Sequence, residues 1–406
     1  MRKDIVSIVV PCYNGEQFVG QFCDTILKQT YKNIQLIIVN DGSTDETEKE
    51  LKKYEDELKS VLTEYIYVKK ENGGQASAIN AGLKYVNGEY LMWIDIDDLM
   101  HPYHVEKKKN YLEMHPDCDI VRCQGYEFGE NDFQNPIAVM GDEEVVGTLF
   151  EDILLGQRTC IPGLYMVKTE KLFEVLTDRT IYEARKSQNN QLLLPITLAD
   201  NVGFIEDKLF YYNVRSASYS HSWKGGLRMR TRWDNIYDIK MHVLQELPLT
   251  EEYFEFLVRQ LELCYLRYRL ICIDEEIIAA DECYAAQVCM DYIGFGNVID
   301  MVGGRKVFMW GFCDFSKKVM ENLERFTPLT FDGYIESDFE KASAEKEEIV
   351  LHRSEINKDE MYVIIPLRYH EDIVALLKEK GFEEGVDYYY PMEKLREEFV
   401  GEKIRS

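Results

Sequence analysis

Short apolar runs alternate with segments of helical periodicity over the first hundred residues of the chain. The predicted strands are Ile5–Val10, Ile34–Val39, Tyr65–Val68 and Tyr90–Asp95, and the predicted helices are Gln17–Gln29, a helix from Ser43 to Leu58, and Ala76–Val86. For the second helix, the Ser43-to-Glu46 spacing predicts a capping box. This alternation predicts a doubly wound, mostly parallel sheet, whose ligands lie beyond the carboxyl ends of the strands.

A different pattern begins near Arg228 and runs to Ile293, where apolar residues recur at three- and four-residue steps and predict a helical connector. After Gly303-Gly304 the strand and helix alternation returns and predicts a smaller α/β domain. Its predicted strands are Lys306–Trp310, Leu329–Tyr334 and Met361–Ile365, and its predicted helices are Lys317–Leu323 and Glu371–Lys380. The expected domains are therefore residues 1–225, 226–300 and 301–406.

Length and charge narrow the class of protein. A chain of 406 residues exceeds what one core usually organises, which favours two or three domains. The formal charge of −26 argues against a nucleic-acid backbone or an anionic lipid surface as the main partner, although a local basic patch could still touch membrane. The first strand is too short for a signal peptide or a membrane span, so we expect a cytoplasmic protein.

The cysteines do not form a recognisable metal site. There are ten, without a Cys-x-x-Cys pair or a histidine at zinc-ligand spacing, so reduced and mostly buried thiols are expected.

Three carboxylates follow the fourth predicted strand. Asp95, Asp97 and Asp98 stand where a strand ends, and paired carboxylates there can hold a hard divalent cation that leaves positions for phosphate oxygens. An isolated Asp-x-Asp more often caps a turn or faces solvent. The neighbouring loops favour the metal interpretation.

Those loops carry ordered motifs at the ends of the other strands. They are Pro11-Cys12-Tyr13-Asn14-Gly15-Glu16, Asn40-Asp41-Gly42-Ser43-Thr44-Asp45 and Glu71-Asn72-Gly73-Gly74-Gln75. Together with the aspartates they resemble the family-2 glycosyltransferases, which have the GT-A fold, over about residues 5 to 221. The expected fold is therefore GT-A, followed by the helical connector and a Rossmann-like α/β domain.

The resemblance implies a nucleotide-sugar donor site. Tyr13 corresponds to the aromatic beside a uracil, and Asp41 to the carboxylate that accepts from its ring N–H, which favours uracil over cytosine. A turn-forming role before Gly42 remains the alternative for Asp41. The residues implied in donor binding are Pro11, Tyr13, Asn14, Asp41, Asn72, Gly73, Gln75, Asp95, Ile96 and Arg215.

The resemblance also assigns the metal. Asp97 corresponds to the principal ligand of Mn²⁺ or Mg²⁺, with Asp95 on the ribose or on the metal through water. In the segment Tyr211 to His221, Arg215 corresponds to a phosphate-binding residue, and His221 either completes the metal shell or is structural.

The chain departs from the family where a Glu-Asp pair supplies the catalytic base. The expected place reads Arg185-Lys186-Ser187-Gln188-Asn189-Asn190-Gln191, and an amide cannot accept a proton usefully near neutral pH. Gln188 and Asn189 can still orient a sugar hydroxyl. Three outcomes stay open: Asp98 or another carboxylate replaces the base, the donor phosphate takes the proton, or the domain binds without turnover.

Two further segments give weaker signals. Thr159 to Tyr165, followed by Lys168 to Phe173, resembles an acceptor-side loop, and an ordinary strand and turn explain it equally well. Gly311 to Ser316 follows a strand but lacks the later glycines of a dinucleotide fingerprint. The C-terminal region, including Asp332 to Asp338, resembles Rossmann-like modules of bacterial polysaccharide-synthesis proteins, and docking of a protein partner or oligomerisation is favoured there over a small ligand.

The resemblance implies transfer of a hexosyl or N-acetylhexosaminyl group from a UDP-sugar to a glycan or lipid-linked acceptor, as in capsule or cell-wall polysaccharide assembly. It implies an inverting, metal-dependent enzyme at the inner face of the cell membrane or in the cytoplasm. The alternative is a sugar-nucleotide-binding scaffold or regulator without catalysis, suggested by the amides at the base position.

Overall fold

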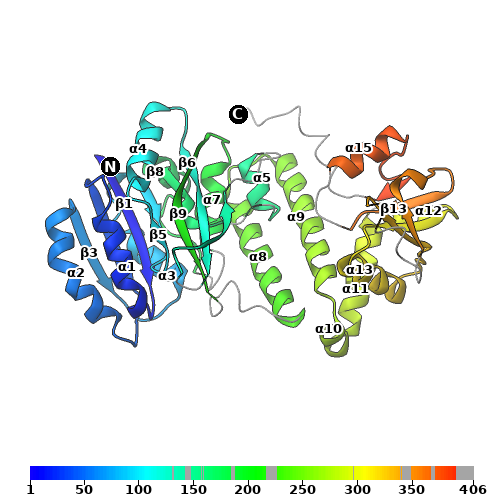
Figure 1. Cartoon of the computed structure of the whole chain (residues 1–406), viewed down its shortest axis with the longest axis horizontal. Coiled ribbons are helices and arrows are strands. Elements are labelled where there is room, and N and C mark those ends of the chain that lie inside the picture. Colours follow the sequence, from blue (N-terminus) through cyan, green and yellow to red (C-terminus); the bar gives the residue numbers. More distant parts are fainter. Residues whose placement is uncertain are drawn as a thin grey trace. The chain divides into compact units, whose positions relative to one another are not determined.

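The computed structural model describes residues 1–129, 132–141, 148–156, 158, 160–183, 188–215, 226–295, 297–338, 340, 349–366 and 371–389. The chain divides into two units, one of Met1–Ser222 with Asp238–Pro248 and one of Trp223–Tyr237 with Leu249–Ser406. Figure 1 shows both, coloured along the chain. The three predicted domain boundaries remain a prediction, and each unit is described separately.

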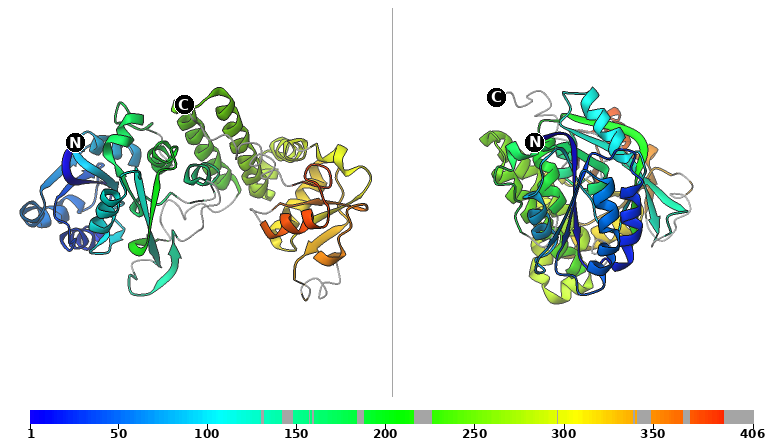
Figure 2. Two further views of the ribbon diagram at one scale, coloured as in Figure 1. Left: turned by 90° about the horizontal axis from the view of Figure 1, so that it is seen from above. Right: turned by 90° about the vertical axis from the view of Figure 1, so that its left-hand side faces the viewer.

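The first unit begins with alternating strands and helices, as the hydrophobic pattern predicts. Its strands are β1 (Arg2–Cys12), β2 (Ile34–Asn40), β3 (Glu64–Lys69) and β4 (Gly88–Trp93), and its helices are α1 (Glu16–Leu27), α2 (Thr47–Val61) and α3 (Gln75–Leu83). The strands pair in parallel in the order β3-β2-β1-β4. Helices α1 and α2 lie on one side of these strands and α3 on the other (Figure 2, right). Both faces of β1 and β2 are therefore covered, which explains their continuous apolar runs.

The rest of the first sheet mixes strand directions. Its elements are β5 (Leu99–Met100), α4 (His104–Met114), β6 (Ile120–Gly129), β7 (Pro136–Met140), α5 (Leu149–Leu154), a 3₁₀ turn (Pro162–Leu164), β8 (Tyr165–Lys168), α6 (Thr169–Val175), α7 (Gln188–Thr197) and β9 (Val202–Val214). Strand β8 runs antiparallel to β4 and β6, while β6 and β9 are parallel. The sheet order continues as β4-β8-β6-β9-β5, with β7 paired to β6. The mostly parallel GT-A architecture is confirmed.

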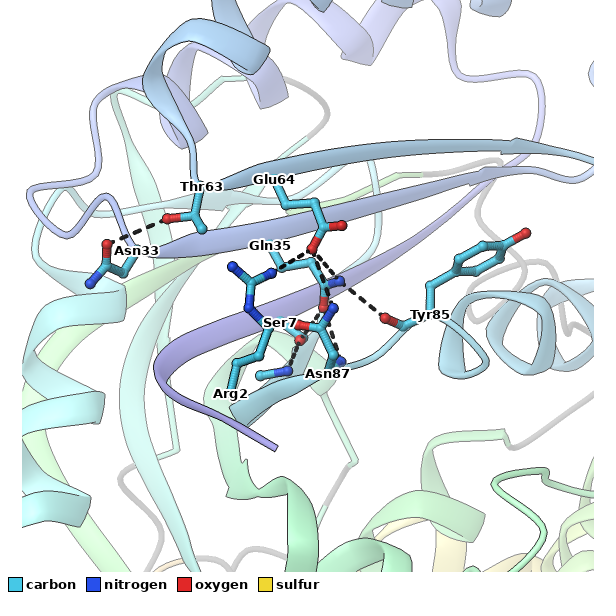
Figure 3. Close-up of polar contacts among 9 residues, drawn as sticks. Arg2, Ser7, Asn33, Gln35, Thr63, Glu64, Tyr85 and Asn87 are labelled. Carbon is cyan, nitrogen blue, oxygen red and sulfur yellow. Dashed lines mark hydrogen bonds and ion pairs between the residues drawn. The ribbon is translucent and has the colours of Figure 1, made fainter.

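A buried polar network fixes the register at the amino ends of the first strands (Figure 3). The Gln35 side chain on β2 is fully buried; its Oε1 accepts from the Ser7 hydroxyl at 2.5 Å, and its Nε2 donates to the Glu64 carboxylate at 2.8 Å and to the Tyr85 carbonyl at 3.0 Å. Glu64 also accepts from the Arg2 guanidinium at 3.0 Å. Because a slip by one residue would leave these polar groups without partners, the network holds the opposite, carboxyl ends of the strands in line.

The second unit joins helices to a five-stranded parallel sheet. Its helices are α8 (Gly226–Glu246), whose second half belongs to the first unit, α9 (Glu251–Cys272), α10 (Glu275–Ala280), α11 (Glu282–Phe295), α12 (Val298–Val302), α13 (Asp314–Phe326) and α15 (Glu371–Glu379). Its strands are β10 (Lys306–Trp310), β11 (Gly333–Glu336), β12 (Val350–His352), β13 (Met361–Ile364) and β14 (Tyr388–Tyr389). The order β12-β11-β10-β13-β14 is that of a Rossmann-like sheet.

One hydrophobic core serves both the helices and the sheet of the second unit. It includes Ile277 and Tyr292 from the helices and Val307, Tyr334 and Ile364 from the strands. The predicted connector is therefore packed against the predicted Rossmann-like part. The predicted strand at Leu329–Tyr334 was placed too early, because Asp332 is held by a hydrogen bond from the Val307 backbone N–H, and β11 begins only at Gly333.

Among the described residues, no helix combines the length and the apolar composition that a bilayer crossing requires. All ten cysteines are free thiols in this structure, and six of them are buried: Cys12, Cys23, Cys123, Cys264, Cys272 and Cys289.

Candidate functional site

The loops after β1, β2 and β3 begin at one edge of the first sheet. Cys12 pairs with Asn40 and Asn40 with Lys69, so the three strands end in one row. Strand β4 ends at Trp93, opposite Val9, and the chain then enters the aspartate segment at the same edge. The motifs that the sequence places at strand ends are therefore neighbours in space.

The three aspartates after β4 form one cluster. Ligand atoms of Asp95, Asp97 and Asp98 lie within 4.8 Å of one another. Asp95 and Asp97 are partly buried, while Asp98 is 1% exposed. Asp98 Oδ1 accepts from the Asn213 backbone N–H at 3.0 Å, and among the described residues its Oδ2 has no hydrogen-bond partner. An unpartnered buried carboxylate oxygen beside two further carboxylates fits a divalent cation with oxygen ligands.

The raised pKa values of these three carboxylates also favour a bound cation. Burial, followed by repulsion from Asp97, raises the pKa of Asp95 to about 7, against the lowering effect of Arg215 and Gln75. Burial also raises the pKa of Asp97, and burial with the two neighbouring carboxylates raises that of Asp98 well above its usual range. Three carboxylates so close disfavour their own ionisation, and a bound cation would relieve that cost.

Two predicted donor-site residues hold the aspartates in place. Gln75 Nε2, at the start of α3, donates to Asp95 Oδ1 at 2.6 Å. Arg215, just past β9, pairs with Asp97 Oδ2 at 2.6 Å, and its guanidinium lies 4.8 Å from the centre of the Phe18 ring. The sequence predicts that Arg215 binds phosphate, and its ion pair with Asp97 places that cation beside the acidic cluster. His221, the predicted further metal ligand, lies outside the described residues.

Asp41, predicted to bind the donor base, contacts the loop that follows β3. Asp41 Oδ1 accepts from Lys70 Nζ at 2.6 Å and from the Gly73 N–H at 3.0 Å, and Oδ2 accepts from the Gly74 N–H at 2.7 Å. Gly42 has a φ of +72°, and a Cβ there would lie 2.7 Å from the Asn72 nitrogen, so the two loops need glycine to approach. The structure thus joins the predicted donor residues Asp41, Asn72 and Gly73.

The loop after β1 presents the predicted aromatic. The Tyr13 side chain is 51% exposed, as a stacking surface must be. Asn14 has a φ of 48°, and its Oδ1 accepts from the Thr44 N–H at 2.8 Å. Pro11 is buried in β1, and Ile96 is 6% exposed within the aspartate segment.

The predicted capping box at Ser43 is wrong. Ser43 Oγ accepts instead from the Asn14 N–H at 3.0 Å, and α2 begins only at Thr47. Asp45 Oδ1 accepts from the Thr47 N–H at 3.1 Å, which starts the helix in place of the box. The motif serves the contact between two loops rather than the helix end.

Helix α7 carries the amides at the position where the resemblance predicts an acidic pair. Asn189 Oδ1 accepts from Trp93 Nε1 at 3.1 Å, and Asn189 Nδ2 donates to the Cys160 carbonyl at 3.3 Å. Asn190 Oδ1 accepts from the Cys160 thiol at 3.1 Å. Gln188 is 8% exposed. Asn189 therefore ties the end of β4 to the predicted acceptor-side segment, with donor and acceptor groups both occupied.

The predicted acceptor-side segment around Gly163 is hydrogen-bonded to a buried lysine. Lys108 Nζ donates to the Gly163 carbonyl at 2.8 Å and lies 2.9 Å from His104 Nε2. His104 Nδ1 faces the Leu209 carbonyl at 2.8 Å, so Nδ1 carries the proton and Nε2 accepts from Lys108. A Cβ at Gly163 would lie 2.0 Å from the Phe210 ring, which only glycine avoids. Thr159, the first residue of this predicted segment, lies outside the described residues.

The sequence assigned no individual role to four residues of this site: Lys70, Trp93, Cys160 and Asn213. Lys70 follows a strand at the carboxyl edge and was detectable from that position. Trp93 looked like a strand residue and Cys160 like part of a turn, and only their contacts with Asn189 give them a place in the site. Asn213 acts through its backbone N–H, which no side-chain pattern reports.

In the second unit, Gly311 has a φ of +91° and α13 begins at Asp314. The Glu336 carboxylate, at the end of β11, accepts from the Phe312 N–H at 3.3 Å. An acidic first turn and an acidic neighbour do not favour a phosphate group there, in agreement with the failed dinucleotide fingerprint.

The class of protein follows from this combination of fold and site. Residues 7–167 match the family model described as glycosyl transferase family 2. The match to this family covers the part of the first unit that carries the strand-end motifs and the aspartates, and the unit has the GT-A fold. The resemblance stated from the motifs is confirmed.

Part of this chain is also similar in sequence to particular known proteins. The chain is 42% identical over 123 residues to an uncharacterised glycosyltransferase of Rickettsia prowazekii, covering 30% of this chain and 36% of that protein. It is 39% identical over 118 residues to the minor teichoic acid biosynthesis protein GgaB of Bacillus subtilis, covering 28% of this chain and 13% of that protein. The matched segment thus spans about a third or less of these curated relatives.

Among solved structures, the chain resembles residues 1–349 of S. aureus TarS in complex with UDP-GlcNAc. The TM-score is 0.51 at 15% identity, covering 78% of this chain and 89% of that chain. At this identity the likeness shows the fold alone, and it confirms the GT-A architecture.

Proposed function

We propose that this protein transfers a hexosyl or N-acetylhexosaminyl group from a UDP-sugar to a glycan or lipid-linked acceptor in the synthesis of a surface polysaccharide or teichoic acid. The observation that carries the proposal is the cluster of Asp95, Asp97 and Asp98 beside the loops that hold Tyr13 and Asp41. The B. subtilis relative in teichoic acid biosynthesis and the UDP-GlcNAc in the TarS structure support the acceptor and donor classes.

Donor binding is divided between two sides of the site. The exposed Tyr13 ring offers a flat face to the base. Asp41 is 3% exposed and already accepts three hydrogen bonds, which leaves one carboxylate lone pair for an imide N–H. Lys70 and the glycine N–H groups fix the Asp41 carboxylate before the donor arrives, which lowers the entropy cost of binding. Arg215 supplies a positive charge beside the acidic cluster.

Asp95, Asp97 and Asp98 would hold Mn²⁺ or Mg²⁺ together. The cation, when bound, neutralises the diphosphate leaving group. Gln75 and Arg215 orient Asp95 and Asp97 through one hydrogen bond and one ion pair. Asp98 fixes β9 to the cluster through the Asn213 N–H.

The acceptor proton has two routes within this proposal. Asn189 has both amide groups engaged, and Asp98 is buried and bonded to a strand, so neither presents a free exposed oxygen. On the first route another carboxylate removes the proton while the acceptor oxygen attacks opposite the leaving group, and the anomeric configuration is inverted. On the second route the donor phosphate accepts the proton on the leaving-group face, and the configuration is retained. The anomeric configuration of the product, read by NMR, separates these routes.

The test of the proposal is release of UDP by purified protein with Mn²⁺, a panel of UDP-sugars and glycan acceptors. We expect Asp97→Asn to lower transfer on the order of 100-fold or more, because it removes a metal-ligand charge. Asp207→Asn is the matched control, because this exposed carboxylate pairs with Lys107 at 2.6 Å rather than with the aspartate cluster. Metal-dependent UDP binding without any turnover would contradict the proposal and favour a sugar-nucleotide-binding scaffold.

A further inference from the structure

Two side-chain amides hold the backbone of Ile181 and Tyr182, which precede α7. The Asn80 side chain on α3 accepts from the Ile181 N–H at 2.8 Å and donates to the Ile181 carbonyl at 2.8 Å. The Gln191 side chain on α7 accepts from the Tyr182 N–H at 2.7 Å and donates to the Tyr182 carbonyl at 3.0 Å. Asn80 and Gln191 are 5% and 3% exposed. All four backbone groups of Ile181 and Tyr182 are thus satisfied by two buried amides.

This clamped segment presents an aromatic ring to solvent. The Tyr182 side chain is 58% exposed, more than any other tyrosine ring among the exposed large residues of the described chain. The His242 ring, from the part of α8 that belongs to the first unit, lies beside it at 4.8 Å between centres with an interplanar angle of 42°. An exposed ring on a fixed backbone loses little conformational entropy when a ligand packs on it.

Contacts through two helices connect Tyr182 to the aspartate cluster. Gln191 lies in the first turn of α7 with Asn189, which bonds Trp93, two residues before Asp95. Asn80 lies on α3, whose first residue, Gln75, bonds Asp95. At about 1.5 Å per helical residue, Asn80 lies about 7–8 Å along α3 from Gln75, the residue that bonds Asp95. The clamped segment is therefore set back along α3 from the aspartates, where an inner sugar of an extended glycan could lie.

The surroundings of the ring suit a sugar. The exposed Glu183 carboxylate, next in the chain, accepts from Asn80 Nδ2 at 3.3 Å, and the His242 ring beside Tyr182 adds ring nitrogens. An aromatic face flanked by a few polar groups matches the apolar C–H face and the hydroxyls of a pyranose. A protein partner would instead need a contiguous apolar patch around the ring.

From this geometry we propose that Tyr182, with His242 and Glu183, forms a subsite for an inner pyranose ring of the acceptor glycan, behind the sugar that receives the transferred group. The inference rests on the proposed function and names a part of its acceptor site. Tyr182 supplies the platform, and Asn80 and Gln191 are positioning residues for it.

The test uses the full chain with Mn²⁺ and UDP, and methyl glycosides of hexose and N-acetylhexosamine di- and trisaccharides as probes. Binding is followed by saturation-transfer NMR, and acceptor KM is measured wherever transfer occurs. We expect Tyr182→Ala to weaken glycoside binding on the order of tenfold, with UDP affinity unchanged. Tyr182→Phe keeps the face of the ring and should stay within about twofold of wild type.

Tyr85→Ala is the matched control, because Tyr85 is 46% exposed and precedes β4 at the opposite edge of the sheet. Equal glycoside binding by wild type and Tyr182→Ala, or no glycoside binding by wild type, would overturn the subsite. If glycosides bind at Tyr182 and no sugar is transferred, the transferase proposal fails and the subsite stands. If UDP and Mn²⁺ bind and transfer proceeds independently of Tyr182, the subsite fails alone.

Discussion

At the scale of single residues, the contacts of Asn189 explain an amide where the family resemblance predicts an acid. Its oxygen accepts from an indole N–H and its nitrogen donates to a carbonyl, and an amide offers an acceptor and a donor at once. A carboxylate could keep the bond from Trp93 but would set a negative charge against the Cys160 carbonyl. The residue therefore joins two segments of the site instead of removing a proton.

Asn189→Asp tests this interpretation. We expect a loss of about 1–3 kcal/mol in unfolding free energy, because the Cys160 carbonyl loses its donor, and no increase in kcat. Asn190→Asp is the matched control, since Asn190 uses its oxygen toward the Cys160 thiol and an aspartate retains that acceptor. Chemical denaturation and steady-state kinetics measure both variants, and a rise in kcat for Asn189→Asp would show that a base can act from this position.

A second residue-scale prediction concerns the buried Lys108. Burial lowers its pKa from 10.5 to about 8, while Cys123 acts in the opposite direction, and burial keeps the pKa of His104 below its usual range. Between pH 8 and 10.5 the unfolded chain binds more protons at Lys108 than the folded chain does, so this group's contribution to stability rises with pH.

The comparison is with Lys108→Met, which has no titrating group at this position. The unfolding free energy of wild type minus that of the variant should increase by about 3 kcal/mol from pH 8 to pH 10.5. Urea denaturation at several pH values measures it. A difference that stays flat or falls over this range would contradict the lowered pKa.

At the scale of elements, the site depends on strands whose carboxyl ends lie in line. Hydrogen bonds near the amino ends of the same strands hold this alignment. Gln35, Ser7 and Glu64 connect β1, β2 and β3 through buried hydrogen bonds (Figure 3). Hydrophobic strands without such bonds could slip past one another at small cost in burial. The polar network therefore helps to align the candidate site, which lies at the other end of these strands.

Gln35→Leu should lower the unfolding free energy by about 2–4 kcal/mol, because Ser7, Glu64 and the Tyr85 carbonyl lose a buried partner. Thr63→Ala, which removes an exposed hydrogen bond of 3.4 Å to Asn33, should change it by less than about 0.5 kcal/mol. Equal stability of the two variants in thermal denaturation would argue that packing alone sets the register.

At the scale of the whole molecule, the two units have different cores and different chemistry. The first carries the acidic cluster and the family-2 motifs, and the second is a Rossmann-like sheet whose core includes its own helices. Partner docking or oligomerisation through the second unit remains the prediction for its role. Ligands of the donor site should accordingly stabilise the first unit.

Adding Mn²⁺ and UDP together at about 100 times their dissociation constants should raise the Tm of the first unit's transition by about 5 °C. Asp97→Asn should abolish the shift, whereas Asp207→Asn should retain it. Differential scanning calorimetry of the full chain follows the transitions, and a shift that survives Asp97→Asn would place the metal elsewhere.

Much of the fold could be predicted from the sequence, because its strands and helices follow local periodicity. The apolar runs at Ile34–Val39 and Lys306–Trp310 became strands because both faces of a parallel sheet are covered. The errors arose where a side chain found a distant partner. Ser43 bonds the Asn14 loop in place of a helix end, and Asp332 bonds Val307 ahead of β11.

In the candidate site, too, some features could be predicted from the sequence and others could not. The sequence alone determined the aspartates, Tyr13 and Asp41, because motifs at the carboxyl ends of parallel strands must meet at one edge. Tertiary structure alone decided what Asn189 bonds and which ring Asn80 and Gln191 present. Asn189 and Asn80 bond residues 96 and 101 positions away, and Gln191 bonds a residue nine positions away. The geometry of all three contacts depends on packing that no local pattern encodes.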